Sequence, residues 1–315
     1  MVGVSVALVN WNSLAYIERC LTAVFAQTCS PCDVVVVDNA STDGSKERIS
    51  QAFPQVKLIE NDTNVGFATG CNQAIAASFG AYVLVLNPDV FLEADFIEVM
   101  LRGFDAKTGV VTGRVYQEAT QEWISGGFFM RRMIRIIPVV DAQDRLEVFG
   151  ASGALALFRR SALEAVAFNS EYFDPAYFMY GEDIDLAWRL QLFGWTCCHQ
   201  PGSGAYHIGS GASQGRMRFI DKPALLQRHI LKNRYLTVWK NASLRLFLWL
   251  FPALVLTEFL LWPYLLVRVP WHFPYLCLAL VDAVRLTPWV LVRRRWIRQQ
   301  RRVSTVYMRR FFLRF

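Results

Sequence analysis

An α/β fold with a mainly parallel sheet is predicted by two features of the sequence. In roughly the first ninety residues, short valine-rich runs alternate with segments of helical spacing, in units of about 25–30 residues. The runs are almost continuously apolar, which is typical of parallel strands buried on both faces. Each run is followed by polar residues, which begin at Asn10, Asp38, Asn61 and Asn87. Because parallel strands end at one edge of a sheet, these residues should form one crevice.

The expected elements follow this alternation. Apolar runs predict strands at Val4–Val9, Val34–Val37, Val56–Glu60 and Tyr82–Leu86. Apolar or small residues at helical spacing predict helices at Leu14–Ala26, Ser45–Ala52, Ala68–Phe79, Ala94–Phe104, Arg160–Val166 and Asp183–Phe193. A further strand is entered through the small residues of Gly150–Leu157. Before it, Gly126-Gly127 and Arg131–Arg135 predict a mobile, basic loop.

Charge is distributed unevenly along the 315 residues. Residues 293–315 carry nine arginines and no acid, which exceeds the net charge of +7, so residues 1–292 sum to −2. A nucleic-acid-binding protein is expected to carry its basic surface on the folded domain, so this class is disfavoured. A basic tail beside apolar segments instead favours anionic membrane lipid as a partner.

Several residues at the predicted crevice are suited to bind a nucleotide. Asp38 follows four valines and is either a turn and helix-capping residue or an acceptor for a base or ribose. Asn64 and Gly66 precede a helix, so they either start it or let the backbone approach a phosphate. The expected donor-binding residues are Asn10, Asn12, Asp38, Asn64, Gly66 and Asn87.

A metal site is expected at Asp89. This carboxylate follows Asn87-Pro88, where proline ends the fourth strand. It is either a turn residue or a ligand of Mg²⁺ or Mn²⁺ that also binds a diphosphate. His207, one of four histidines, is either structural or a further ligand of the same metal.

A second acidic cluster begins a helix at Glu182 and Asp183. Acids in a first turn either compensate the helix dipole or accept a proton from an attacking hydroxyl. The surrounding aromatic residues favour catalysis, because aromatic faces often line sugar sites and partial desolvation raises the pKa of a carboxyl group. The expected acceptor-binding residues are Gly153, Ala154, Tyr180 and Trp188.

The chain is expected to divide into a catalytic unit at 1–240 and a membrane-associated part at 241–315. Leu246–Val267 has one charge in 22 residues and would reach about 33 Å as a helix, enough for a bilayer core. Prolines interrupt this stretch and Phe273–Val292, and the second stretch also contains Asp282 and Arg285, which are costly in lipid. In-plane or re-entrant helices are therefore favoured over a spanning hairpin or a soluble helical domain. No cleavable signal peptide is recognised, so the cytoplasmic face of the cell membrane is the expected location.

Four ordered motifs carry a resemblance to a known family. They are Val35–Ser45, Asn64–Ala68, Leu86–Asp89 and Phe178–Leu186. Over roughly residues 3–240 the chain resembles the inverting family 2 glycosyltransferases, and above all the rhamnosyltransferase-like branch that builds bacterial polysaccharides. The resemblance implies a GT-A fold, a divalent metal and a nucleotide-diphosphate sugar as the donor.

The resemblance also implies roles for single residues. Asp38 matches the nucleotide-binding aspartate and Asp183 matches the catalytic base. Asn87-Pro88-Asp89 matches the metal-binding DxD motif with asparagine in place of the first acid. His207 matches the histidine that often joins the metal. Asn233-Arg234 resembles an Arg-Asn element in reversed order, so no role is transferred to it.

The expected reaction is a single displacement that moves a sugar to a lipid-linked saccharide. Rhamnose is the favoured sugar and dTDP or UDP the expected nucleotide, by resemblance alone. The missing first acid at Asn87 motivates an alternative, a non-catalytic membrane-anchored protein that binds nucleotide sugars or glycans. A dinucleotide-dependent oxidoreductase is disfavoured, because the turn Asn10–Ser13 lacks the glycines of GxGxxG.

Overall fold

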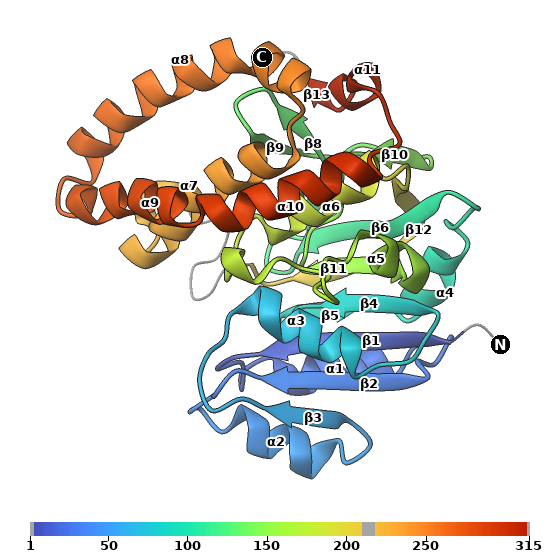
Figure 1. Ribbon diagram of the computed structural model, residues 1–315. Coiled ribbons are helices and arrows are strands. Elements are labelled where there is room, and N and C mark those ends of the chain that lie inside the picture. The colour runs from blue at the N-terminus through green and yellow to red at the C-terminus, as the bar shows by residue number, and fades with distance from the viewer. Residues whose placement is uncertain (1–2, 210–217, 314–315) are drawn as a thin grey trace.

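The computed structural model describes residues 3–209 and 218–313, which form an α/β fold as predicted (Figure 1). The strands are β1 (Val4–Asn10), β2 (Asp33–Asp38), β3 (Lys57–Glu60), β4 (Tyr82–Leu86), β5 (Val90–Leu92), β6 (Thr108–Gln117), β7 (Trp123–Ser125), β8 (Phe128–Arg131), β9 (Arg135–Pro138), β10 (Leu146–Val148), β11 (Leu155–Arg159), β12 (Thr196–His207) and β13 (Phe312–Leu313). The α-helices are α1 (Ile17–Phe25), α2 (Ser45–Ala52), α3 (Phe67–Ala76), α4 (Phe96–Leu101), α5 (Arg160–Val166), α6 (Glu182–Leu192), α7 (Ala224–Asn241), α8 (Leu244–Arg268), α9 (Phe273–Arg285), α10 (Thr287–Gln300) and α11 (Thr305–Arg309).

The main sheet is parallel at one side and mixed at the other. Its order is β10-β12-β6-β11-β4-β1-β2-β3, with β5 paired to β12 and β7 paired to β6. The four strands predicted from the valine-rich runs, β1 to β4, are parallel to one another. Beyond them, β11 is antiparallel to both β4 and β6. The carboxyl ends of β1, β2 and β4 therefore meet at one edge, as the sequence predicts.

Both faces of β1, β2 and β4 are buried. In β2, Val35 and Val37 belong to the core cluster that includes residues of α3, α5 and α6. Val34 and Val36 belong to the cluster on the other face, with residues of α1, α2 and α4. Successive side chains of a strand point to opposite faces, so a continuous valine run fits only a strand that is covered on both sides.

The expected loop at Arg131–Arg135 is shorter than predicted: residues 132–134 form a turn, and strands begin on both sides of it. This segment is the tip of an antiparallel hairpin of β8 and β9, in which Arg131 pairs with Arg135. Phe128 and Met130 point into the core, and β13 pairs with β8 in a three-stranded sheet. The apolar residues alternate with exposed or partly exposed ones, which is the pattern of a strand that buries one face.

The C-terminal helices follow the α/β unit in the chain, and parts of them pack on its core. The helix α8 is long and apolar enough to cross a membrane, and it continues through Pro252 and Pro263. The pair α9 and α10 meets the same criterion only together, and it is bent by 52°. Phe311 and Phe312 lie in the same core cluster as residues of β2 and α6. The division into parts at 1–240 and 241–315 stays a prediction.

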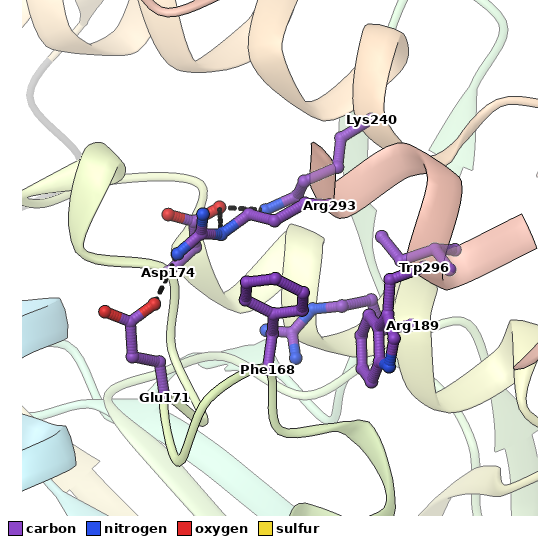
Figure 2. Close-up of a pocket in the computed structure, with 8 residues that line it drawn as sticks. Phe168, Glu171, Asp174, Arg189, Lys240, Arg293 and Trp296 are labelled. Carbon is purple, nitrogen blue, oxygen red and sulfur yellow. Dashed lines mark hydrogen bonds and ion pairs between the residues drawn. The ribbon is translucent and has the colours of Figure 1, made fainter. Parts of the chain in front are cut away.

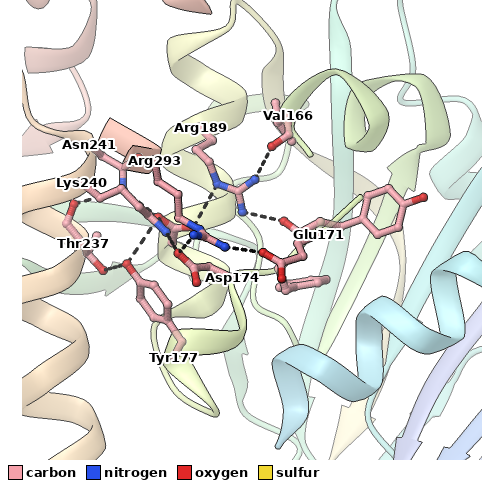
Figure 3. Close-up of polar contacts among 12 residues, drawn as sticks. Val166, Glu171, Asp174, Tyr177, Arg189, Thr237, Lys240, Asn241 and Arg293 are labelled. Carbon is pink, nitrogen blue, oxygen red and sulfur yellow. Dashed lines mark hydrogen bonds and ion pairs between the residues drawn. The ribbon is translucent and has the colours of Figure 1, made fainter. Parts of the chain in front are cut away.

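A buried ionic cluster joins these helices to the sheet domain (Figure 2). Lys240 on α7 pairs with Asp174 and, at 2.8 Å, with Asp185 on α6. Arg293 on α10 contacts Asp174 at 3.3 Å, and Arg189 Nε donates to Asp185 at 3.0 Å. Figure 3 shows the same contacts, with Arg189 also reaching the carbonyl of Val166 and Arg293 reaching Glu171.

The charges of this cluster balance. Three cations (Arg189, Lys240 and Arg293) face three carboxylates (Glu171, Asp174 and Asp185). Burial raises the pKa of Asp174, but the charges of Lys240 and Arg293 outweigh this effect and hold that pKa well below its usual value. Asp174 is therefore ionised in the folded protein. The stability of the protein depends on the two cations that compensate this buried charge.

We expect Lys240→Met to lower the free energy of unfolding by about 3–5 kcal/mol, because it leaves Asp174 and Asp185 buried without their shared cation. The matched control is Lys46→Met. Lys46 pairs with Glu60 at 3.1 Å on the surface, and such a pair contributes at most about 1 kcal/mol. Urea unfolding of both variants measures the difference. Equal losses would contradict a structural role for the cluster.

Candidate functional site

The carboxyl ends of β1 and β2 form one wall of the candidate site. Their register places Asn10 opposite Asp38, and Asn10 Nδ2 donates to Asp38 Oδ1 at 2.6 Å. The same amide donates to the hydroxyl groups of Ser41 and Ser45 at 3.1 and 2.9 Å. Asn10 is fully buried and Asp38 is 1% exposed. Asn10 was predicted to contact the donor, and the structure corrects this prediction. Its amide group is buried and already hydrogen-bonded, so Asn10 orients Asp38 from below.

Asn12 lies in the exposed turn after β1. Its backbone is left-handed, with φ of 49°, a conformation that asparagine tolerates better than most residues. Its Oδ1 accepts a hydrogen bond from the Thr42 N–H at 2.8 Å, and its own N–H donates to Ser41 Oγ at 3.0 Å. Asn12 thus joins the turn after β1 to the turn after β2, beside Asp38.

Asn64 and Gly66 form the second wall. Asn64 Oδ1 accepts the Gly66 N–H at 2.9 Å, and Gly66 has φ of +85°. A Cβ atom at Gly66 would lie 2.5 Å from the Phe178 ring, so both the backbone angle and the close approach require glycine. Asn39, next to Asp38, donates to the Gly66 carbonyl at 3.2 Å. The two predicted donor-binding segments are therefore in direct contact.

Asp89 and His207 converge as the resemblance implies. Asp89 follows β4, His207 ends β12, and Asp89 Oδ2 lies 3.1 Å from His207 Nε2. Two neighbouring ligands of an octahedral Mg²⁺ or Mn²⁺ would be separated by about 3 Å. Both side chains are slightly exposed, at 18% and 19%. The oxygen and nitrogen atoms, their spacing and their accessibility fit a divalent metal.

A chain of backbone contacts connects this pair to the acidic cluster. The Asn87 N–H donates to the Ala154 carbonyl at 2.9 Å. The next residue back, Gly153, donates its N–H to Asp183 Oδ2 at 3.2 Å. Gly153 and Ala154 immediately precede β11, the antiparallel neighbour of β4. The pairing of β11 with β4 therefore brings Asp183 to the same edge as Asp89.

Glu182 and Asp183 differ in their surroundings. Burial and the neighbouring Asp183 charge raise the pKa of Glu182 to about 8, and Glu182 Oε2 has no hydrogen-bond partner among the described residues. Burial also raises the pKa of Asp183, against the opposing effect of N–H bonds from Gly153 and Ile184. Asp183 is the more exposed of the two. A carboxylate with a raised pKa is a stronger base, which is suited to general-base chemistry.

The predicted acceptor-binding residues do not all reach the site. Tyr180 is partly exposed beside Glu182, and Lys222 lies 5.0 Å from the centre of its ring. Trp188, in contrast, is fully buried and packs on Phe149 and Phe312. The expected acceptor contact of Trp188 is wrong, because α6 turns this ring into the core.

Two asparagines that the sequence analysis left without a role support the site. Asn39 joins the Asp38 turn to Gly66, and it follows Asp38 directly in a motif that was recognised. Asn233 on α7 contacts the turn that leads into Glu182. Its partners lie about fifty residues earlier in the chain, so no local sequence pattern identifies it.

Comparisons with known proteins agree with this arrangement. The family model described as glycosyl transferase family 2 matches residues 5–167. An N-acetylglucosaminyl-diphospho-decaprenol L-rhamnosyltransferase of Mycobacterium tuberculosis is 31% identical, over 64% of this chain and 75% of that protein. A poly-beta-1,6-N-acetyl-D-glucosamine synthase of Staphylococcus epidermidis is 26% identical, over 63% of this chain and 48% of that protein.

Two solved structures share the fold. GalNAc-T7, solved with UDP, GalNAc and Mn²⁺, has a TM-score of 0.60 at 15% identity. The match covers 76% of this chain and 48% of the GalNAc-T7 chain. S. aureus TarS (residues 1–349), solved with UDP, has a TM-score of 0.50 at 16% identity. The match covers 76% of this chain and 67% of the TarS chain. The GT-A fold expected from the resemblance is thus confirmed. With a family model that matches half of its length, the chain belongs to glycosyl transferase family 2.

Proposed function

We propose that this glycosyltransferase moves a sugar, with inversion, from a nucleotide-diphosphate donor to a lipid-linked saccharide at the cytoplasmic face of the cell membrane. The observation that carries the proposal is the position of Asp183. Its carboxylate accepts the Gly153 N–H at 3.2 Å, and Gly153 belongs to the segment that is bonded to Asn87 at the donor side. A proton acceptor and a donor-binding edge are therefore neighbours.

The choice of substrates follows from the relatives. The mycobacterial relative is named as a rhamnosyltransferase that acts on a diphospho-decaprenol-linked sugar. We carry rhamnose and a lipid-linked saccharide acceptor over to this chain on that basis. The structures of GalNAc-T7 and TarS hold UDP, so UDP stands beside dTDP as the nucleotide of the donor.

In the donor site, the nucleotide would lie along the ends of β1 and β2. Asp38 is held by Asn10 and by the Ser41 N–H, so its remaining lone pairs are fixed in direction for a base or ribose. Gly66 precedes α3 and allows a phosphate to approach the backbone at the start of that helix. Asn12, Asn64 and Asn87 would supply amide groups around the donor.

At the acceptor side, Asp183 would take the proton of the attacking hydroxyl. The hydroxyl oxygen then bonds to the anomeric carbon, and the bond from that carbon to the nucleotide diphosphate breaks on the opposite face. A positioned base contributes about 10²–10⁴-fold to such a step. Gly153, Ala154 and Tyr180 are proposed to contact the acceptor, while Glu182 shapes the electrostatic environment of the base.

Asp89 and His207 are proposed to hold a divalent metal, Mg²⁺ or Mn²⁺. Within residues 3–209 and 218–313 no group of three or more His, Cys, Asp and Glu residues is assembled for a metal, so diphosphate oxygens and water would complete the coordination. When bound, the metal offsets the charge that develops on the leaving diphosphate. Asn87, which replaces the first acid of the motif, would contribute a neutral amide beside Asp89.

Membrane attachment is proposed through α8 and the C-terminal arginines. On α8 the side chains of Leu248, Phe251 and Phe259 are about half exposed or more. The acidic residue of that helix, Glu258, accepts the Tyr235 hydroxyl at 2.7 Å and thus faces α7. A helix with one face paired and the other apolar is suited to lie in the plane of a membrane surface.

A second candidate function, a non-catalytic protein that binds nucleotide sugars or glycans, is motivated by the asparagine at position 87. Hydrolysis of a donor by the purified protein separates the two functions. A glycosyltransferase releases the nucleotide slowly from its own donor even without acceptor, whereas a binding protein retains the donor intact. Calorimetric binding without turnover would favour the binding protein.

Asp183→Asn should lower the rate of transfer by about 10²–10⁴-fold. Donor affinity should change little, because Asp38 and Gly66 are untouched. Transfer is measured with a radiolabelled sugar and donor binding by calorimetry. Turnover at the wild-type rate in this variant would remove Asp183 from the role of base.

Asp89→Ala should abolish the metal dependence of donor binding. In the wild type, we expect weaker donor binding after chelation than with Mn²⁺, because Asp89 and His207 would hold a metal whose positive charge attracts the diphosphate. The matched control is Asp141→Ala, which changes an exposed acid and should keep the wild-type difference. An equal response of both variants to chelator would contradict the metal assignment.

Glu182→Gln should change the pH dependence of stability. The pKa of Glu182 is about 8 in the folded protein and about 4.3 in an unfolded chain. Folding therefore takes up a proton between these values, and the stability of the wild type relative to Glu182→Gln should fall by a few kcal/mol as pH rises from 5 to 8. Urea unfolding at several pH values measures this. The exposed control Glu122→Gln should not reproduce the effect, and equal profiles would contradict the raised pKa.

A further inference from the structure

The turn between Tyr177 and Gly181 has a strained backbone. Phe178 and Tyr180 both have φ of +64°, a left-handed conformation that costs free energy for residues with a side chain. The turn leads directly into Glu182 and Asp183 at the start of α6. Such a conformation persists only when surrounding groups hold it.

Asn233, on α7, supplies that hold. Its Nδ2 lies within hydrogen-bond distance of the carbonyl oxygens of Tyr177 (2.9 Å), Met179 (2.9 Å) and Tyr180 (2.6 Å). Its side chain is 1% exposed. An amide group has two hydrogens, so the three carbonyls share them, and one side chain fixes the direction of most peptide units in the turn.

The same turn touches the donor side. The Phe178 carbonyl accepts the Ala68 N–H at 3.2 Å, and the Phe178 ring covers Gly66. The turn therefore lies between the loop proposed to bind the donor and the carboxylate proposed as the base. Its shape sets the distance between these two groups.

We propose that Asn233 is a positioning residue for glycosyl transfer: it fixes the turn at residues 177–181 and thereby the place of Asp183 relative to the donor. The inference rests on the proposed function, because it takes Asp183 as the base. It gives α7, the helix that precedes α8, a direct part in the reaction geometry. It also explains why a buried asparagine, and not an apolar residue, occupies this position of α7.

Asn72 provides a matched control. Its amide also makes three hydrogen bonds to backbone, to the Phe173 carbonyl at 2.7 Å and from the N–H groups of Tyr172 and Phe173 at 3.0 and 2.8 Å. These bonds lie earlier in the same connection, between Glu171 and Asp174. Loss of Asn72 should therefore lower stability without moving Asp183.

The experiment compares Asn233→Ala and Asn72→Ala in the full-length protein in detergent. For Asn233→Ala, we expect kcat, calculated from the concentration of protein that still binds the donor, to fall about 10²-fold. Small displacements of a reacting group have effects of this size. Donor affinity should remain within about threefold of the wild type, since the donor contacts are kept. For Asn72→Ala, kcat should remain within about threefold of the wild type.

A pH profile supplies a readout that lost stability alone would not change. A loosened turn admits water to Glu182 and Asp183, which reduces the desolvation that raises their pKa values. In the profile of kcat against pH, the fall on the acidic side should therefore move to lower pH in Asn233→Ala. In Asn72→Ala it should stay in place. Among the described residues, the other ionisable groups beside this turn and Glu182 are Cys71, Tyr177, Tyr180, Asp185, Lys222, His229 and Lys232.

The outcomes distinguish a failure of the positioning role of Asn233 from a failure of the proposed function. Wild-type kcat and an unchanged pH profile in Asn233→Ala, with an inactive Asp183→Asn, would overturn the positioning role alone. An active Asp183→Asn would overturn the proposed function first. If Asn233→Ala does not fold, Asn233→Ser, which keeps one donor, takes its place. Hydrogen exchange of the peptide at 177–184 should then be faster than in the wild type, and unchanged protection would contradict the proposal.

Discussion

The parallel pairing of β1 with β2 and β4 is the constraint on which the candidate site depends. It ends three strands at one edge of the sheet, so that Asn10, Asp38 and Asn87 are neighbours although they are far apart in the sequence. Because both faces of these strands are buried, a register shift would move valines out of two cores at once. The burial that stabilises the sheet thus also fixes the donor side.

The proposed base, Asp183, belongs to a different part of the chain, and two sets of contacts bring it to this edge. From the sheet, β11 pairs with β4 and presents the Gly153 N–H to Asp183. From the C-terminal helices, α7 holds the preceding turn and the ionic cluster anchors α10. A membrane that binds α8 to α10 would therefore act on helices that are joined to α7, which holds the turn before Asp183, and that reach Asp174 through Arg293.

Prediction from the sequence succeeded where structure is local. The continuous valines of β2 and the bounds of α2 and α5 follow from apolar pattern alone. It missed the strands β8 and β9 on either side of the turn between Arg131 and Arg135. It failed for Trp188, because composition does not separate an aromatic core from a sugar-facing surface. Asn233 was not assigned since its three partners belong to a distant segment. Strand ends and ordered motifs made Asp38, Asp89 and Asp183 the candidates for the site, and their roles stay predictions.

Transfer with inversion from a nucleotide sugar is the reaction proposed for this protein. The most direct test incubates the detergent-purified protein with dTDP- and UDP-sugars and a synthetic lipid-diphosphate saccharide, and determines the anomeric configuration of the new bond by NMR. The account predicts a product from one donor class, with the configuration opposite to that of the donor. A product with the donor's configuration would contradict the single displacement, and intact donor in every reaction would favour the binding protein.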